Sequence, residues 1–262
     1  MARVNEAVTP LDRGALAERI RTGETTLGSF AGLGSTMAVE VLAAAGLDWI
    51  LVDLEHGGGD EASIGDAVAA AGGYGAAVLV RVETPDRIRI GRALDAGAAG
   101  VMLPRVNSAA EVATIVPHLH YPPLGDRGVA TYNRSLRWGM DRAGLATSND
   151  EVLGIVQIET ADALAEVDDI AALDAVDVLF VGPLDLSYAL GVPLDFDAPV
   201  FRDALEAVGA AARKHGKSAG ILSPDAQAAA TRAAQGFTFL PVGSDSTLLA
   251  EAATTVVSTL RD

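Results

Sequence analysis

The sequence feature that most constrains the fold is a regular alternation of short apolar runs with longer helical stretches. Most of the runs are nearly continuous in Val, Ile and Leu, which is typical of parallel strands that are buried on both faces. The pattern therefore predicts a parallel sheet. Its strands are expected at Thr26–Ala31, Trp49–Asp53, Ala77–Val82, Gly100–Leu103, Leu153–Ile158, Val178–Val181, Ser218–Leu222 and Thr238–Val242.

Helical stretches separate these runs. They include Ser35–Ala45, Asp86–Asp95, Ala109–Leu119, Thr160–Leu173, Phe201–His215 and a final helix at Ser246–Leu260. A strand and a helix repeated eight times predict an α/β fold, the (β/α)8 TIM barrel, which typically takes about 250 residues as a single domain. An open doubly wound sheet is the alternative, but no Gly-x-Gly-x-x-Gly motif follows the first run.

Two segments fall outside the repeat. Residues 1–22 form an N-terminal segment with a helix predicted at Leu11–Arg21, and residues 23–262 form the predicted barrel domain. Residues 121–150 are a long insertion after the fourth helix. Loops of this length in a compact domain are usually functional or disordered.

Composition excludes several classes of function. The net charge of −16 disfavours nucleic acid and anionic membrane surfaces as partners. The absence of cysteine excludes disulfides, thiolate nucleophiles and cysteine-based zinc sites. Because no signal peptide or apolar stretch of membrane-spanning length is present, we expect a cytoplasmic protein that acts on a small molecule.

Polar residues gather at the ends of the predicted strands, where active sites of such barrels lie. Carboxylates and cations therefore converge on one rim. The residues are Asp53, Glu55, His56, Arg81, Arg105, Gln157, Glu159, Gly182, Pro183 and Asp185.

Glu159 and Asp185 end neighbouring predicted strands. Two carboxylates so placed would repel each other unless a cation lay between them, and oxygen ligands suit Mg²⁺ or Mn²⁺. The alternative is that each carboxylate caps a helix N-terminus. The pairing favours a metal site.

His56 and Arg81 are candidate catalytic residues. His56 follows a strand and precedes three glycines, and the acids near it could bring its imidazole into the range of a general base. The other histidines, His118, His120 and His215, lie in or just after helices, which disfavours a three-histidine zinc site. Arg81 needs an anionic partner, either from the protein or from a ligand. Arg105 could serve the same role or point outward.

Lysine chemistry is excluded by position. The only lysines, Lys214 and Lys217, precede the seventh strand, so neither reaches the rim where a Schiff-base aldolase needs its lysine. The absence of a Gly-x-x-x-x-Gly-Lys loop also disfavours a phosphorylated substrate, although Gly243-Ser244 could serve an anion.

Several motifs resemble those of the HpcH/HpaI aldolase family, in order along nearly the whole chain. They are Asp53-Leu54-Glu55-His56-Gly57, Tyr121-Pro122-Pro123 with Arg127-Gly128, Gln157-Ile158-Glu159-Thr160, Gly182-Pro183 with Asp185-Leu186-Ser187, Gly220-Ile221-Leu222 and Val242-Gly243 with Asp245. The resemblance implies a metal-dependent (class II) pyruvate aldolase, such as those that cleave 4-hydroxy-2-oxoheptanedioate. Such enzymes split 4-hydroxy-2-oxo acids reversibly into pyruvate and an aldehyde, through a metal-bound pyruvate enolate.

The resemblance also implies roles for individual residues. Glu159 and Asp185 correspond to ligands of a divalent cation, Mg²⁺, Mn²⁺ or Co²⁺. The implied catalytic residues are His56, Arg81, Asp53 and Asp95, the last matching an aspartate that reaches the histidine from a neighbouring subunit. The implied substrate-binding residues are Gln157, Gly182, Pro183 and Leu222. A homo-oligomer, typically a hexamer that exchanges its last helix, is expected.

One departure leaves the aldehyde open. The insertion at Ala130–Gly139 is unlike the Ala- and Ser-rich version of the heptanedioate enzymes. Other metal-enolate lyases, namely an oxaloacetate decarboxylase or a citrate-lyase-like thioester lyase, are the alternative function, and a non-catalytic binding barrel is a further one.

Overall fold

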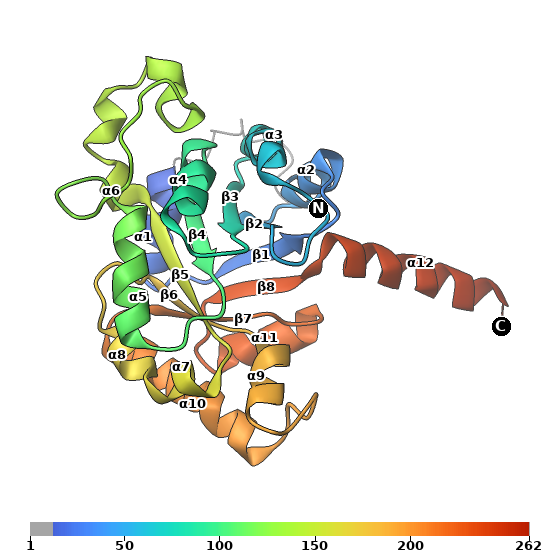
Figure 1. Cartoon of the computed structure of the whole chain (residues 1–262). Helices are drawn as coiled ribbons and strands as arrows, with labels where there is room; N and C mark the ends of the chain where they lie inside the picture. Colours follow the sequence, from blue (N-terminus) through green and yellow to red (C-terminus); the bar gives the residue numbers. More distant parts are fainter. Residues whose placement is uncertain (1–12, 262) are drawn as a thin grey trace.

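The computed structural model describes residues 13–261, and it forms a closed barrel of eight parallel strands in sequence order (Figure 1). This confirms the predicted (β/α)8 fold and its leading helix. The strands are β1 (Thr26–Ala31), β2 (Trp49–Asp53), β3 (Ala77–Arg81), β4 (Gly100–Leu103), β5 (Leu153–Ile158), β6 (Val178–Val181), β7 (Ser218–Ile221) and β8 (Phe239–Ser244).

Helices surround the barrel, and many of them begin at a side chain that caps the first turn. Ser35, Asp60, Asp86, Ser108 and Thr160 each accept a hydrogen bond from a backbone N–H three residues later. The helices are α1 (Arg13–Arg21), α2 (Thr36–Ala44), α3 (Glu61–Gly72), α4 (Arg87–Asp95), α5 (Ala109–Ile115), α6 (Ser148–Glu151), α7 (Ala161–Ala165), α8 (Val167–Ala171), α9 (Pro183–Ala189), α10 (Pro199–Lys214), α11 (Ala226–Ala234) and α12 (Asp245–Arg261).

The element boundaries differ from the predicted ones in a few places. The helix predicted over Thr160–Leu173 is divided into α7 and α8 at Glu166, whose backbone has φ −105° and ψ 16°. The stretch predicted to be helical up to Leu119 ends in a 3-10 turn, Val116–Leu119, because Pro117 cannot donate a helical hydrogen bond. Of the helix predicted at Leu11–Arg21, the first two residues lie outside the described residues.

The amino ends of the strands are closed by α1. Leu16 and Ile20 of this helix are buried against Trp49 and Phe239, whose rings stack with their centroids 4.0 Å apart. The hydroxyl of Ser218 donates to the carbonyl of Ile20 at 2.8 Å, which fixes the helix to β7. Because this end is filled by side chains, any large cavity has to open at the other end.

A second apolar core lies between the strands and the surrounding helices, from Ala31 and Val39 round to Phe237 and Leu240. The two cores reflect the alternation of side chains along each strand, one into the barrel and the next out of it. The barrel wall is therefore a boundary between two separate sets of apolar side chains.

The insertion is folded onto the barrel near α3 and α4. It contains two 3-10 segments, Arg134–Gly139 and Ala143–Leu145, followed by α6. Arg134 packs beside Gly65 and Gly97, where a Cβ atom would stand 3.3 and 3.2 Å from its side chain. Glycine at these positions leaves the space that the arginine occupies.

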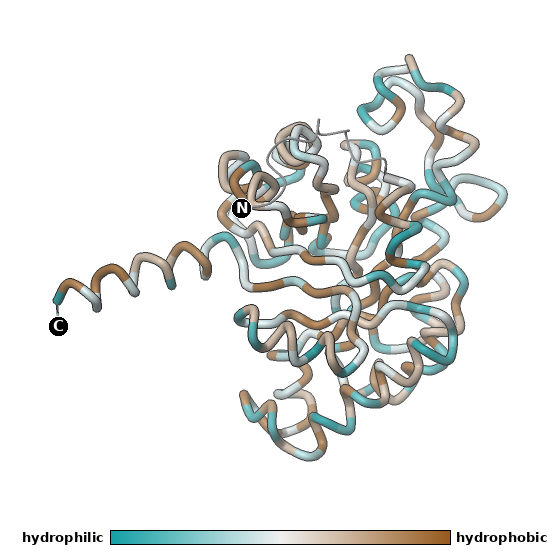
Figure 2. The backbone as a smooth tube through the Cα atoms, turned by 180° about the vertical axis from the view of Figure 1, so that it is seen from behind, coloured by the Kyte–Doolittle hydropathy of each residue, from teal (hydrophilic) through white to brown (hydrophobic). Residues whose placement is uncertain are grey.

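The last helix, α12, extends away from the barrel (Figures 1 and 2). Only its first residue, Asp245, is buried, and it accepts hydrogen bonds from the backbone N–H groups of Gly32 and Leu33. Several large apolar side chains along the helix are exposed, namely Leu248, Leu249, Val256, Val257 and Leu260. In residues 13–261, no helix is both long enough and apolar enough to cross a bilayer.

Candidate active site

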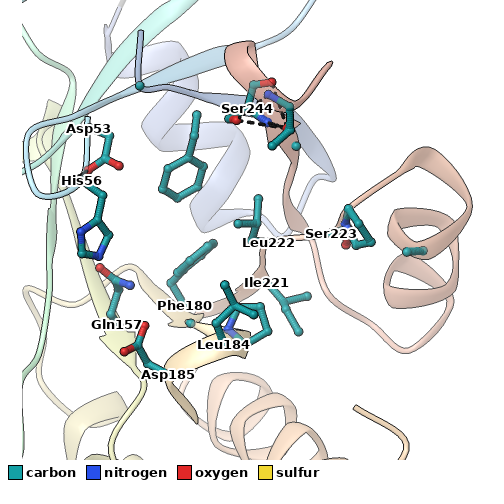
Figure 3. Close-up of a pocket in the computed structure, with 18 of the residues that line it drawn as sticks. Asp53, His56, Gln157, Phe180, Leu184, Asp185, Ile221, Leu222, Ser223 and Ser244 are labelled. Atoms are coloured by element: carbon teal, nitrogen blue, oxygen red, sulfur yellow. Dashed lines mark hydrogen bonds between the residues drawn. The ribbon is translucent and has the colours of Figure 1, made fainter. Parts of the chain in front are cut away.

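A cavity of about 590 Å³ opens at the carboxyl ends of the strands (Figure 3). It lies where barrels of this type place their active sites, and its size is in the range of small-molecule pockets. Eight of the ten site residues predicted from the sequence line it: Asp53, His56, Arg81, Gln157, Gly182, Pro183, Asp185 and Leu222. Glu159 and Asp95 are not among the lining residues.

Arg81 is held at the end of β3 by two carboxylates. Its Nε and Nη2 donate to the two oxygens of Asp53 at 2.9 and 2.7 Å, and its Nη1 lies 3.1 Å from Glu55. The backbone register that pairs Asp53 with Arg81 across β2 and β3 sets up this contact. The guanidinium also lies over the ring of Phe30 at 5.2 Å. A buried cation is thus fixed in one orientation beside the cavity.

The charge of Asp53 is stabilised by the same contact. Burial alone would raise the pKa of this carboxyl, but the hydrogen bonds and charge of Arg81 outweigh burial and lower it. The backbone N–H groups of Glu55 and His56 also donate to Asp53 Oδ1. Asp53 therefore remains ionised and shapes the turn that carries His56.

His56 lies at the mouth of the cavity, and 68% of its side chain is exposed. The acid nearest to its ring is Glu55, with Oε2 3.9 Å from Nε2, and this oxygen also faces Arg81. Asp53 contacts the backbone N–H of His56. The imidazole is thus accessible to a ligand in the cavity, with one carboxylate beside it.

Glu159 is buried at the end of β5, and both of its oxygens are engaged. Oε1 accepts from the backbone N–H of Arg105 at 2.7 Å, and Oε2 accepts from the amide of Gln157 at 2.9 Å. Burial raises the pKa of Glu159, and the negative charges of Asp185 and Glu55 raise it further. A cation at this carboxylate would relieve that unfavourable charge.

The residues around Glu159 fit a divalent cation. Gly182 passes so close that a Cβ atom would stand 2.7 Å from Glu159 Oε2, and the buried Oε1 of Gln157 has no hydrogen-bond partner among the described residues. Asp185, half exposed in the first turn of α9, offers a second carboxylate. All of these donors are hard oxygen atoms, which Mg²⁺ and similar ions prefer.

The protein supplies only part of a coordination shell. Within residues 13–261, no group of three or more His, Asp or Glu side chains is placed to hold a metal ion. Mg²⁺ is usually bound through one or two carboxylates, with water and substrate completing its shell. Two carboxylates beside an open cavity match that mode better than a closed structural site.

Arg105 lies in the loop after β4, in a conformation that sequence analysis did not predict. Its backbone is left-handed, with φ 53°, and this conformation accompanies the N–H contact to Glu159. Its guanidinium is two-thirds exposed and lies 3.7 Å from Asp185. The backbone of Arg105 therefore serves Glu159 while the side chain points outward along the rim.

Asp95 lies away from the cavity of its own chain. It is the last residue of α4, which returns toward the amino ends of the strands, and it accepts a hydrogen bond from the buried Arg127 at 2.7 Å. Asp95 and His56 are therefore not brought together within one chain.

The remaining histidines and both lysines also lie elsewhere. None of them lines the cavity, as predicted. His118 pairs with Asp126, and His215 and Lys214 pair with Asp168.

The fold and this rim define a TIM-barrel protein with two carboxylates, an arginine and a histidine around one cavity. Comparison with known proteins identifies the family: residues 27–252 match the model of the HpcH/HpaI aldolase/citrate lyase family. The chain belongs to this family.

Individual relatives agree with that placement. The chain is 37% identical to a hydroxypyruvate/pyruvate aldolase of Deinococcus radiodurans, over 92% of this chain and 87% of the relative. It is 37% identical to a 4-hydroxy-2-oxovalerate aldolase of Rhodococcus jostii, over 90% of each chain. A crystal structure of a family member from Burkholderia cenocepacia superposes with a TM-score of 0.91 at 35% identity, covering 95% of this chain and 100% of that one.

The close approach of Gly182 to Glu159 leads to a prediction. In Gly182→Ala the added methyl group would displace the carboxylate, and we expect binding of Mn²⁺ to weaken by about 10–100-fold, the usual loss when the support of a ligand is changed. Isothermal titration calorimetry of the metal-free protein measures the effect. Gly91→Ala is the matched control, because nothing lies within 4 Å of its added methyl group. Equal affinities in the two variants would contradict the assignment of Glu159 as a ligand.

Proposed function

We propose that this chain is a class II pyruvate aldolase that cleaves 4-hydroxy-2-oxo acids reversibly to pyruvate and an aldehyde. The observation that carries the proposal is that Arg81, Gln157 and Asp185 line one cavity, with the buried Glu159 held directly behind Gln157 by a hydrogen bond of 2.9 Å. Membership of the HpcH/HpaI family, and relatives that are named pyruvate and 4-hydroxy-2-oxovalerate aldolases, support it.

Glu159 and Asp185 would hold Mg²⁺, Mn²⁺ or Co²⁺, and the chemistry supplied by such an ion when bound is Lewis-acid polarisation of the substrate's keto oxygen. Gln157 and the backbone at Gly182 would orient the oxygens of the 2-oxo acid beside these carboxylates. Pro183 begins α9, and the first N–H groups of a helix lack partners within it, so this turn can receive the substrate carboxylate.

Arg81 would stabilise the negative charge that develops on the substrate, and His56 would accept a proton from it. When the bond between C3 and C4 breaks, negative charge develops on the enolate oxygen of pyruvate, and the fixed guanidinium of Arg81 lies beside the cavity to stabilise it. His56, exposed to the cavity, would take the proton from the C4 hydroxyl group, either directly or through water. Asp53 keeps Arg81 in place, and Leu222 would provide an apolar contact to the substrate in the cavity.

Removal of divalent metal tests the reaction class. After treatment with EDTA, we expect pyruvate release from 4-hydroxy-2-oxo acids to fall to background, and added Mg²⁺, Mn²⁺ or Co²⁺ to restore it. A coupled lactate dehydrogenase assay on a panel of such acids measures the release. Full activity in protein shown by elemental analysis to be free of metal would refute the metal-dependent mechanism.

Two substitutions separate the roles of the cationic residues. Arg81→Ala should slow both aldol cleavage and oxaloacetate decarboxylation by about 10²–10³, because both reactions form the enolate. His56→Ala should slow aldol cleavage by about 10²–10⁴ and spare decarboxylation, in which no hydroxyl proton is removed. Rates are compared at equal metal content. Equal losses of decarboxylation in the two variants would show that His56 has a structural role instead.

The working enzyme is, in this proposal, a homo-oligomer, a hexamer in which α12 packs on a neighbouring subunit. The exposed apolar side chains of α12 support this, because an extended helix with such a face is unstable alone in water. Asp95 of one subunit would then be available to the His56 of another, which its own chain does not allow.

Light scattering at micromolar concentration tests the assembly. We expect a mass several times that of the 26.8 kDa chain, and Val256→Glu should lower it because the charge falls on the apolar face of α12. Arg261→Glu, also on α12 but in a charged position, is the control. A fully active monomer would rule out both the assembly and the role of Asp95.

A further inference from the structure

We propose that the active-site cavity continues through the barrel wall into an apolar side pocket that holds the carbon chain of the aldehyde. The enzyme would then favour 4-hydroxy-2-oxo acids whose aldehyde part is a hydrocarbon chain over those in which it is short or polyhydroxylated. This inference rests on the proposed aldolase function and specifies its substrate class.

The residues that line the cavity come from both sides of the barrel wall. Phe30 and Phe180 belong to the core inside the barrel, whereas Phe201 and Ile221 belong to the core between the strands and the helices. A single cavity touches both sets, so it leaves the barrel interior near the carboxyl ends of β6 and β7. The side pocket, as we define it, is lined by Leu184, Phe196, Phe201, Ile221, Ser223 and Ala228.

The walls of this side pocket are almost entirely apolar. Phe196 and Phe201 meet edge to face with their centroids 5.4 Å apart, and Leu184 lies at the junction with the metal-binding end (Figure 3). A hydrocarbon chain gains free energy by leaving water for such surroundings, whereas a polyhydroxylated chain would lose hydrogen bonds to water without replacement. The side pocket therefore favours a hydrocarbon chain over a polyhydroxylated one.

Ser223 is the one polar residue of the side pocket. It follows Leu222, which packs against the interior core, so the alternation along the strand turns Ser223 to the outer side. Ser223 is only 2% exposed, and its hydroxyl has no hydrogen-bond partner among the described residues. The hydroxyl oxygen is enclosed by the protein, so Ser223 adds almost no polar surface to the side pocket.

The other polar groups near β8 and α11 line the cavity outside the side pocket. The hydroxyls of Ser244, Ser246 and Thr247 already bond to one another at 2.9 and 3.1 Å. Arg232, which also lines the cavity, donates from Nη1 to the side-chain oxygen of Gln235 at 3.0 Å. The three hydroxyls are thus engaged within the chain, and apolar contact is the main contribution of the side pocket, of which Arg232 is not part.

The test uses aldol addition of pyruvate to a series of unbranched aldehydes, from acetaldehyde to hexanal, with glycolaldehyde and glyceraldehyde as polar members. We expect kcat/KM for the aldehyde to rise roughly threefold to fourfold with each methylene until the side pocket is filled. Ala228→Leu should abolish this rise by filling the pocket. Ala230→Leu, an exposed position of the same helix, should retain it.

The outcomes separate this inference from the function on which it rests. A flat dependence on chain length in the natural enzyme, or equal slopes in the two variants, would overturn the side pocket while oxaloacetate decarboxylation continued. Loss of the proposed function would look different: no aldehyde of the series would add to pyruvate in metal-loaded protein, whether or not oxaloacetate is decarboxylated, and both proposals would fall together.

Discussion

The site depends on one buried cation, Arg81, and on the two ion pairs that it forms with Asp53 and Glu55. Removing a guanidinium from water is costly, and a single carboxylate compensates only when geometry is good. Here the parallel register places Asp53 opposite Arg81, and the bidentate contact follows from adjacent strand ends. The same turn then places Glu55 beside Arg81 and His56 at the cavity. Much of the catalytic rim is thus a consequence of how β2 meets β3.

This arrangement needs a rigid barrel with only one open end. Trp49 and Phe239, stacked inside the barrel, and α1 below them fill the amino end. Gly28 makes the stacking possible, because a Cβ atom there would lie 2.3 Å from the ring of Trp49. Since the interior is closed on one side, the polar residues at the carboxyl ends face a cavity whose floor is apolar. Charges in such surroundings act more strongly than they do in water.

The sequence predicted the barrel, and most of the site residues it predicted do line the cavity, because both depend on local pattern. Apolar runs such as Leu153–Ile158 identify buried strands, and the residue that ends a strand, such as Arg81, faces the rim whatever its distant neighbours are. Features that depend on contacts between distant segments were not predictable. The left-handed backbone of Arg105 and the Arg127–Asp95 pair arise only when separate loops meet. The division of the helix at Glu166 likewise has no signal as strong as a proline or glycine.

The two ends of the cavity are under different physical constraints. This difference affects how the substrate specificity of such a barrel can change. The end with Arg81, Gln157 and Glu159 is constrained by charge: each group there is hydrogen-bonded to another, so a substitution disturbs its neighbours. The side pocket is constrained only by volume, since Phe196, Phe201 and Ala228 contribute shape and little polarity. Apolar walls tolerate changes of size far better than a charged network tolerates the loss of a partner. The chemistry on pyruvate can therefore stay fixed while the choice of aldehyde changes through the side chains of α9–α11 and the segments between them.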